Sequence, residues 1–404
     1  MPEALASTEI LATAYLAEGQ WEEAEKLCMQ VIEILKTKYW EQHYLHPDML
    51  TSMANLALIY QSQGRWEEAE KLFVQVIETI KTNLGGEHPS MLACMANLAL
   101  TYMKQGQWNR AEGLFVQVIE TSKTKFGGEH PNTLTSLGNL ASTYISQGRL
   151  VEAQKLFVQI MNTHKTTLGE DHPNTLTSIN NLASTYIGQG QWNEAEKLNM
   201  QVIKARKKKL SEDHPDSLAS MNNLASTYMH QGQWEKAEKL HMQVAETRKK
   251  KLGENHPDTL SSMANLASTY TNRGRWEEAE KLNMQVMEAR KTILGEDHPN
   301  TLTSVTNLAS TYWSQGQWEE AKKLFVQVME TRKTKYGEDH PATLMSMTNV
   351  ALTWKSLGQD EDALDLLRTC LVKQTQTLGP DHPHTFATSA TLLEWATERL
   401  NAGA

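Results

Sequence analysis

The sequence has few cysteines, no long apolar run and no excess of positive charge. Its three cysteines, Cys28, Cys94 and Cys370, are scattered and odd in number, which fits neither a disulfide framework nor a zinc-binding pattern. No apolar stretch is long enough to span a bilayer, and the first residues lack the basic and apolar regions of a signal peptide. We therefore expect a cytoplasmic protein with no membrane partner.

The charge balance also limits the kind of partner. The net charge of −9 over 404 residues is opposite in sign to the basic field that general nucleic-acid binding requires. Hydrophobic residues make up 40% of the chain and charged residues 22%, which is typical of a folded, soluble protein. The chain has no phosphate-binding loop, dinucleotide fingerprint, zinc-protease helix or nucleophile elbow. We predict no catalysis, no cofactor and no metal.

What the sequence does contain is one unit repeated at a fixed interval. The stretch Asn265–Tyr270 (Asn-Leu-Ala-Ser-Thr-Tyr) returns 42 residues later as Asn307–Tyr312. A period of this size is the signature of stacked repeats, and it overrides the domain count that length alone would suggest. A His-Pro dipeptide marks the same period, at His46, His88, His130, His172, His214, His256, His298, His340 and His382.

Each unit is predicted to form two helices separated by a glycine. After His256, Pro257 sets the helix start, and Asp258 or Thr259 is expected to cap it, because apolar residues then recur at helical spacing up to Tyr270. Gly274 ends this first helix. The second helix is predicted from about Trp276 to Lys291, with Trp276 on its apolar face. One such pair cannot bury its apolar face alone, so neighbouring units must stack.

The pattern Asn-Leu-Ala-x-x-Tyr, then Gly, then Trp-x-x-Ala resembles the tetratricopeptide repeat, whose usual period is about 34 residues. The 42-residue unit with His-Pro is similar to the kinesin light chain type, and the near-identical units are most similar to the C-terminal arrays of fungal NOD-like (NACHT/NB-ARC) receptors. The resemblance implies an all-α fold, a right-handed superhelical solenoid of about nine tetratricopeptide helix pairs plus a C-terminal capping helix. We expect one domain over residues 1–404, with units at about 4–45, 46–87, 88–129, 130–171, 172–213, 214–255, 256–297, 298–339 and 340–381, and the capping helix at about 385–400.

The main candidate for a binding site is a row of asparagines with the period of the repeat. An amide offers two donors and an acceptor, which suits the recognition of an extended peptide backbone. In tetratricopeptide proteins the matching Asn lies on the first helix, faces the concave groove and contacts bound peptide. The other interpretation is that each Asn bonds a neighbouring loop carbonyl and locks the stack. We call these residues the asparagine ladder: Asn55, Asn97, Asn139, Asn181, Asn223, Asn265, Asn307 and Asn349.

Two further sets of positions lie beside the asparagine ladder. Serines follow it one helical turn later, and they either bond a ligand or only let helices approach closely. The positions after the Tyr differ most between units, as a tuned recognition surface would, although drift at an exposed helix end would have the same effect. From these sets we predict contacts by Ser184, Ser226, Ser268, Met229, His230, Thr271, Asn272 and Trp313.

Three other features have simpler interpretations. The basic runs Lys207–Lys209 and Lys249–Lys251, with Lys204, Arg206 and Arg248 beside them, either complement the helix dipole or bind an acidic partner segment. The His-Pro histidines are one period apart, too far to share a metal ion, so we expect them to pack or cap loops. Three polar residues, Asn199, His241 and Asn283, stand where other units have Phe73, Phe115, Phe157 and Phe325. They either bind water or a ligand or reach solvent, and we expect them to reach solvent.

Together these features predict a non-catalytic scaffold that binds a protein or peptide. An extended or helical segment would lie in a concave groove, held by the asparagine ladder. By resemblance, the chain would be the sensor region of a fungal immune-type receptor. The alternatives are a cargo adaptor like kinesin light chain, and a structural scaffold that self-associates.

Overall fold

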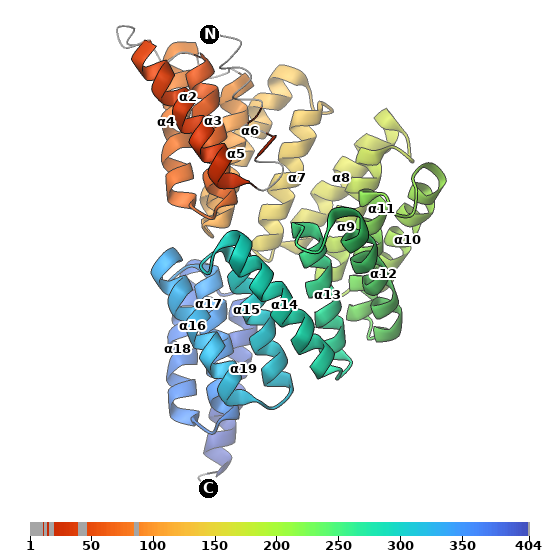
Figure 1. The fold of residues 1–404 in the computed structure, drawn as a ribbon, viewed down its shortest axis with the longest axis vertical. Coiled ribbons are helices and arrows are strands. Elements are labelled where there is room, and N and C mark those ends of the chain that lie inside the picture. Colours follow the sequence, from red (N-terminus) through yellow and green to blue (C-terminus); the bar gives the residue numbers. More distant parts are fainter. Residues whose placement is uncertain (1–10, 12–13, 16–19, 39–46, 85–88, 403–404) are drawn as a thin grey trace. The chain divides into compact units, whose positions relative to one another are not determined.

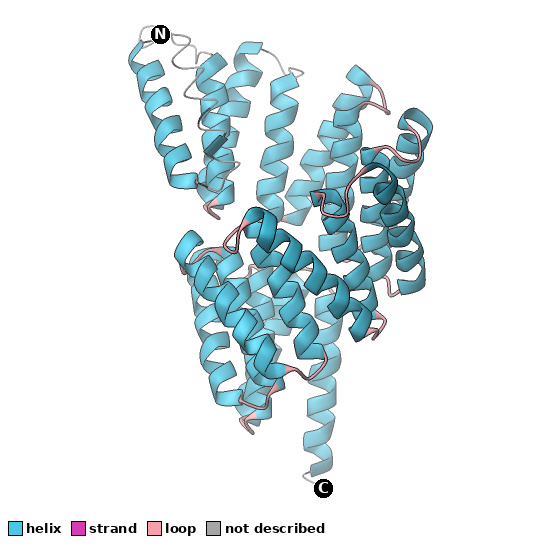
Figure 2. Cartoon of the chain, turned by 45° about the vertical axis from the view of Figure 1, so that its right-hand side comes forward, coloured by secondary structure: helices cyan, strands magenta, loops and turns pink. Residues whose placement is uncertain are grey.

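The computed structural model describes residues 11, 14–15, 20–38, 47–84 and 89–402. In this part of the chain all regular structure is α-helix, joined by short loops, and no strand is present (Figure 2). None of these helices combines the length and the apolar character needed to cross a bilayer. The bounds (Figure 1) are α2 Trp21–Lys38, α3 Pro47–Ser62, α4 Trp66–Leu84, α5 Pro89–Lys104, α6 Trp108–Phe126, α7 Pro131–Ser146, α8 Leu150–Leu168, α9 Pro173–Gly188, α10 Trp192–Lys209, α11 Pro215–His230, α12 Trp234–Leu252, α13 Pro257–Asn272, α14 Trp276–Leu294, α15 Pro299–Ser314, α16 Trp318–Tyr336, α17 Pro341–Ser356, α18 Asp360–Thr377 and α19 Pro383–Ala402.

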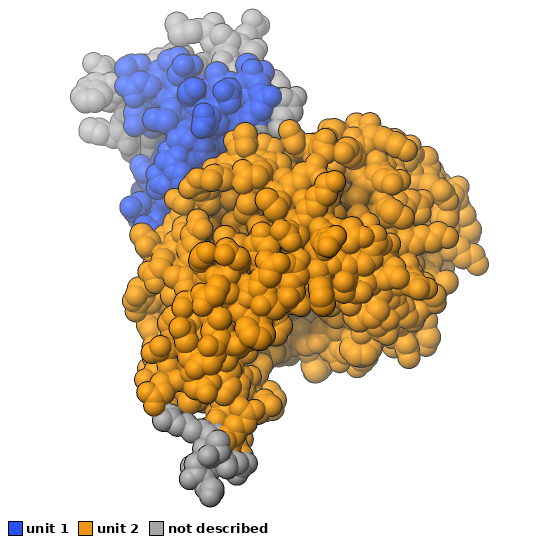
Figure 3. Space-filling view, turned by 60° about the horizontal axis from the view of Figure 1, so that its bottom comes forward, with its two compact units in different colours: residues 1–143 blue, residues 144–404 orange. Residues whose placement is uncertain are grey.

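The chain divides into two compact units, Met1–Thr143 and Tyr144–Ala404 (Figure 3). The first contains α2 to α6, the second contains α8 to α19, and α7 crosses the boundary. Inside each unit, helices that begin after His-Pro alternate with helices that begin near Trp; we call them first and second helices. The single domain predicted over residues 1–404 stays a prediction.

Within each unit every helix packs against the next one along the chain, as α13 does with α14 and α14 with α15. First helices also contact the following first helix directly, in α9 with α11 and in α13 with α15. Within each unit the core is thus a stack in which each pair completes its neighbour, as the repeat pattern predicts.

The first helices begin at the histidine of His-Pro. The backbone N–H of Asp258 donates to Nδ1 of His256 at 3.1 Å, and Pro257 occupies the first helical position. The same bond joins Asn174 to His172 at 3.2 Å and Ala342 to His340 at 3.1 Å. We expected Asp258 or Thr259 to be the cap, but the His256 imidazole caps the helix. Pro257 has no N–H to satisfy, so the first free N–H of the helix is that of Asp258, and it bonds the imidazole.

Small residues let the two helices of a pair approach closely. Ala267 of α13 and Ala279 of α14 are both 0% exposed, and Gly274 makes the tight turn between their helices with φ +73°. Trp276 was expected on the buried face of α14. It is 42% exposed, because it stands at the first position of the helix, where the turn leaves one side of the indole open to solvent.

Candidate binding face on the first helices

The asparagine ladder lies at the same position of eight first helices, from α3 to α17. Seven of these residues are half-buried and Asn181 is exposed. The main-chain carbonyl of each Asn from Asn97 onward accepts a bond from the Thr hydroxyl four residues later, as Asn265 does from Thr269 at 3.0 Å. The side-chain amides take no part in these bonds.

Most of these amides are unused inside the molecule. Asn265 donates from Nδ2 to Oδ1 of Asn222 at 2.9 Å. Among the described residues, no hydrogen bond involves the side chains of the other seven. The expected alternative, in which each Asn bonds a neighbouring loop carbonyl, therefore has no support in the hydrogen bonding of this structure. An unused amide at a half-open position is available to a ligand.

A row of buried threonines lies four residues after the asparagine ladder. These threonines form the junction between one repeat and the next. The members from Thr101 onward are no more than 1% exposed. In three places their hydroxyl also bonds the second helix of the preceding pair. Nδ2 of Asn199 donates to Thr227 at 3.0 Å, Nδ1 of His241 lies 2.9 Å from the Thr269 hydroxyl, and Nδ2 of Asn283 donates to Thr311 at 3.0 Å. Nothing in the sequence distinguishes these threonines, because a Thr next to a Tyr near a helix end is typical of a surface position.

These bonds show that one sequence prediction was wrong. Asn199, His241 and Asn283 do not reach solvent; they are 0%, 1% and 2% exposed. They occupy the core position of Phe73 and Phe115, and the Thr hydroxyl of the next unit gives them a polar partner. Burial lowers the pKa of His241 to about 4, with a smaller opposing effect from the backbone of Asn222, so the ring is neutral at physiological pH.

The variable positions after the Tyr contact the next unit as well as the surface. Met229 accepts from the Thr269 hydroxyl at 3.2 Å through its sulfur. Thr271 lies 3.2 Å from the Thr311 hydroxyl. The variation at these positions therefore partly reflects the contacts between successive repeats. His230 and Asn272 remain exposed at the helix ends, and Asn272 donates to the carbonyl of Ser268 at 2.8 Å.

The serines beside the ladder keep an open face. Ser184 and Ser268 are exposed and Ser226 is half-buried. Ser310, at the same position of α15, bonds the carbonyl of Thr306 in its own helix at 2.9 Å. Together with the ladder amides, these hydroxyls give the first helices a polar and uncharged surface.

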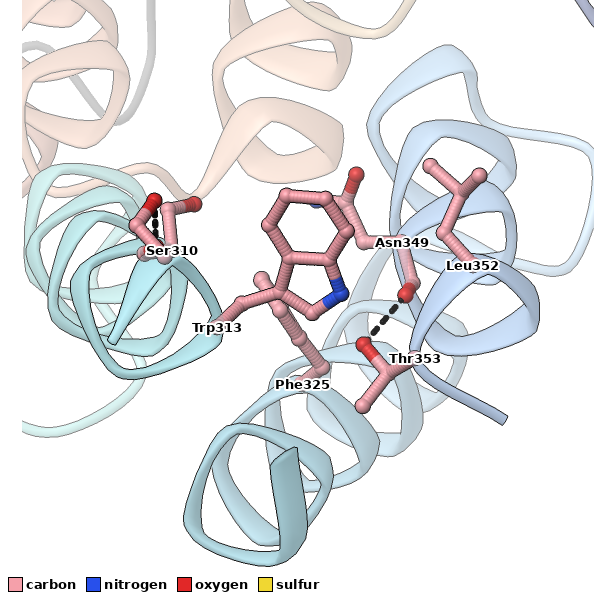
Figure 4. A pocket seen from close by; sticks show the side chains of 7 residues that line it. Ser310, Trp313, Phe325, Asn349, Leu352 and Thr353 are labelled. Carbon is pink, nitrogen blue, oxygen red and sulfur yellow. Dashed lines mark hydrogen bonds between the residues drawn. The ribbon is translucent and has the colours of Figure 1, made fainter. Parts of the chain in front are cut away.

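One pocket on this face brings predicted site residues together. It has a volume of about 270 Å³ and lies among α15, α16 and α17. Trp313 stands in its centre (Figure 4) and is 41% exposed, while its Nε1 donates to Ser356 at 3.2 Å. The ladder residue Asn349 and the serine of α15 also line it. The full lining is Ser310, Trp313, Ser314, Phe325, Asn349, Leu352 and Thr353.

The basic runs at the ends of α10 and α12 are less exposed and less positive than the sequence suggested. Arg206 is only 4% exposed, so it does not belong to a surface patch. Lys207 pairs with Glu212 at 2.8 Å and Lys249 with Glu254 at 2.7 Å, and Lys251 pairs with Asp213. A role of the remaining lysines in binding an acidic partner stays a prediction.

The buried arginine belongs to a repeated clamp that sequence reasoning missed. In α14, Nη1 of Arg290 donates to the Ser304 hydroxyl at 2.9 Å and to the Asn300 carbonyl at 3.2 Å. Arg290 is 8% exposed, and burial lowers the pKa of its guanidinium. Arg206, Arg248 and Arg332 make the same two contacts with the helix that follows them. In the sequence, each of these arginines stands 14 residues before the serine that it bonds. This repeated spacing could have revealed the clamp.

The histidines of His-Pro act as caps, as described above for His172, His256 and His340. Among the described residues, no three His, Cys, Asp or Glu side chains come close enough together to hold a metal ion.

Comparison with protein families tests the repeat assignment. A tetratricopeptide repeat model matches residues 48–124, 91–162, 133–208, 216–292, 261–334 and 304–371, and a second tetratricopeptide repeat model matches residues 5–39. The chain belongs to the tetratricopeptide repeat family. The predicted all-α tetratricopeptide array is thereby confirmed. No curated protein matches this tetratricopeptide chain.

Solved structures place the array among related folds. A structure from Podosopora anserina, described as a putative kinesin light chain with nearly identical TPR-like repeats, is 36% identical; the match covers 51% of this chain and 97% of that one, with a TM-score of 0.43. The apo form of the quorum sensor NprR from B. thuringiensis is 16% identical over 81% of this chain and 87% of that one, with a TM-score of 0.56. A Rap protein complexed with Competence and Sporulation Factor is 11% identical over 93% and 99%, with a TM-score of 0.57. The last two similarities extend the fold relation over most of the chain.

Proposed function

We propose that this tetratricopeptide array is a non-catalytic scaffold that binds a segment of a protein or peptide along its first helices. The observation that carries the proposal is the asparagine ladder, in which seven of eight side-chain amides have no partner among the described residues. Amides that recur at the same position of successive first helices would bond a peptide backbone whatever its side chains are. The Rap protein of similar fold, which is complexed with Competence and Sporulation Factor, supports a binding role.

Trp313 and its pocket would anchor one side chain of the bound segment. The volume of about 270 Å³ is just below the range of about 300–1,000 Å³ typical of small-molecule sites. The aromatic and aliphatic parts of Trp313, Phe325 and Leu352 favour an apolar side chain, while Asn349 supplies a polar group at the edge. The exposed serines Ser184 and Ser268 would bond the segment further along.

The test is a selection of peptides on the immobilised full chain, from a displayed library of random peptides. The enriched peptides are then measured against the triple variant Asn181→Ala, Asn223→Ala, Asn307→Ala. These side chains make no bond inside the described structure, so the variant is expected to fold normally. We expect affinity to fall at least about tenfold, because each lost hydrogen bond weakens binding by about 0.5–1.5 kcal/mol.

The matched control removes three exposed amides outside the ladder, in the variant Asn162→Ala, Asn174→Ala, Asn300→Ala. It is expected to bind as the unmodified chain does. Peptides that bind the ladder variant with unchanged affinity would sink the proposed role of the ladder, and a library that yields no enriched peptide would count against peptide binding altogether.

Two narrower roles remain as proposals for the biological context. The near-identical units favour the sensor region of a fungal immune-type receptor, and the 42-residue period favours a kinesin light chain-like cargo adaptor. The coding sequence upstream of Met1 separates them: a nucleotide-binding domain supports the receptor and a heptad-repeat segment supports the adaptor. Both roles place the protein in the cytoplasm.

A further inference from the structure

The second helices carry an exposed four-residue pattern that the proposed binding face does not use. In α12, Lys239, Met242, Gln243 and Glu246 occupy positions i, i+3, i+4 and i+7, which form one face of a helix. All four are exposed. The same pattern recurs in the next two second helices of the unit, and we call the three sets the second-helix stripe. Its other members are Lys281, Met284, Gln285 and Glu288 of α14, and Lys323, Val326, Gln327 and Glu330 of α16.

The stripe is apolar in its centre and charged at both margins. Met242 is 39% exposed and Met284 is 43% exposed, and methionine is a flexible side chain common on protein-binding surfaces. Among the described residues, Lys239 and Glu246 take part in no ion pair. In α16, Val326 is half-buried against the core around Phe325, and Lys323 pairs with Glu320 of its own helix at 2.8 Å. The exposed methionines of the stripe therefore lie on α12 and α14.

The order of the columns determines which partner fits. Residues at the same position of α12, α14 and α16 line up across the three helices and form columns. The Lys column lies toward the N-terminal ends of the helices, the Glu column toward their C-terminal ends, and the column of Met, Val and Gln lies between them. A matching surface must repeat with the same spacing between helices and carry its charges in the reverse order. A second copy of this chain satisfies both requirements, because its stripe has the same period by construction.

Only one of the two symmetric arrangements pairs opposite charges. If the second copy is rotated by 180° about an axis that runs along the stack, α14 of one copy lies antiparallel to α14 of the other. Lys281 then faces Glu288 of the second copy, and Met284 packs near Gln285. Rotation about an axis parallel to the helices places Lys against Lys, which costs binding energy.

We propose that the second-helix stripe is a self-association surface on which two copies pack with α12, α14 and α16 antiparallel to the same helices of the other copy. The pattern is interrupted in α10, where Lys204 replaces the Glu, and in α8, where Asn162 does. The contact therefore centres on α14. A narrow apolar row between charged columns gives a dimer that forms weakly and that salt weakens further. Two helices of the first unit carry the same pattern: α2 with Lys26, Met29, Gln30 and Glu33, and α4 with Lys71, Val74, Gln75 and Glu78.

The experiment is sedimentation velocity on the full chain over about a hundredfold range of concentration, at low and high salt. An acidic variant carries Lys239→Glu, Lys281→Glu and Lys323→Glu. A basic variant carries Glu246→Lys, Glu288→Lys and Glu330→Lys. We expect the unmodified chain to dimerise at low salt, and each variant alone to associate at least about tenfold more weakly, because every paired charge becomes a like-charge contact. An equimolar mixture of the two variants is expected to restore the dimer.

The control variant Lys209→Glu, Lys251→Glu, Lys335→Glu changes the net charge by the same amount at exposed positions on another side of their helices. It is expected to dimerise as the unmodified chain does. The proposal is overturned if the unmodified chain stays monomeric, if the control weakens the dimer as much as the acidic variant does, or if the mixture associates no better than its components. Peptide binding by the first helices is a separate measurement, so failure of one proposal leaves the other intact.

Discussion

Replacing His241 by Phe probes the polar position in the core of the central units. His241 is 1% exposed and bonds the Thr269 hydroxyl through Nδ1, while its Nε2 has no hydrogen bond within reach. Phe73 and Phe115 fill the same position in other units and are fully buried. Thr269 keeps a partner in the variant, because its hydroxyl also donates to the carbonyl of Asn265. His241→Phe therefore removes a titratable ring without leaving a buried group unsatisfied.

The size of the effect follows from the pKa of His241, which burial lowers from 6.5 to about 4. Between these values the unfolded chain binds a proton that the folded chain excludes. The free energy of unfolding therefore decreases as the pH falls through this window, by about 1.4 kcal/mol for each pH unit. Acidification from pH 7.5 to 5.0 covers about 1.5 units of the window and should cost the unmodified chain about 2 kcal/mol through this residue.

The assay compares the unmodified chain and His241→Phe by urea unfolding at pH 7.5 and pH 5.0. Repeat arrays can unfold in more than one step, so hydrogen exchange of the amides in α11 to α13 gives the local free energy of opening. We expect the variant to lose about 2 kcal/mol of the pH dependence in these helices. Every other residue is the same in both proteins, so the difference between them isolates His241.

Phe325→His is the reciprocal variant, because Phe325 occupies the same position in α16 and is 4% exposed. It should introduce a new pH dependence of the same sign in α15 to α17. A His241→Phe variant that keeps the full pH dependence of the unmodified chain would contradict a lowered pKa at His241.

Further predictions concern single contacts. Arg290→Ala should lower the free energy of unfolding by about 2 kcal/mol, because it leaves the buried Ser304 hydroxyl and the Asn300 carbonyl without their charged donor; urea unfolding beside the exposed control Lys291→Ala measures this, and equal midpoints would contradict it. Ala279→Leu should cost about 1–3 kcal/mol, since Ala279 is 0% exposed between packed helices; a melting temperature unchanged in calorimetry would show that the helices can separate. His298→Ala removes a helix cap and should cost about 1 kcal/mol, visible as faster hydrogen exchange in the first turn of α15 and not in α13.

Much of the fold follows from the sequence because its signals are local and repeated. The interval of 42 residues, the glycine in each turn and the apolar spacing place the helix pairs without knowledge of their contacts. The identity of the helix cap was missed, since His256 precedes Pro257 and the usual capping residues Asp258 and Thr259 follow it. Local patterns allow several candidates for a cap, and only the backbone geometry selects among them.

The candidate site was less predictable, because its chemistry depends on contacts between units. Asn283 in a second helix reads as a surface residue, and its burial became evident only when Thr311 was found opposite it. Arg290 at a helix end reads as a complement to the helix dipole, yet it bonds the following helix. In contrast, the asparagine ladder follows from the repeat period alone, and its role in binding a ligand stays a prediction.

The buried threonines have a consequence for how such a chain can change its length. The Thr hydroxyl can bond its own helix and still accept an Asn or His from the preceding pair, and it also tolerates a Phe there. From Thr101 to Thr353, each junction therefore presents the same hydroxyl to the helix pair that precedes it. Whole units can be gained, lost or exchanged by recombination within the gene without creating a mismatched junction. The number of repeats can therefore vary while the contact at each junction is kept.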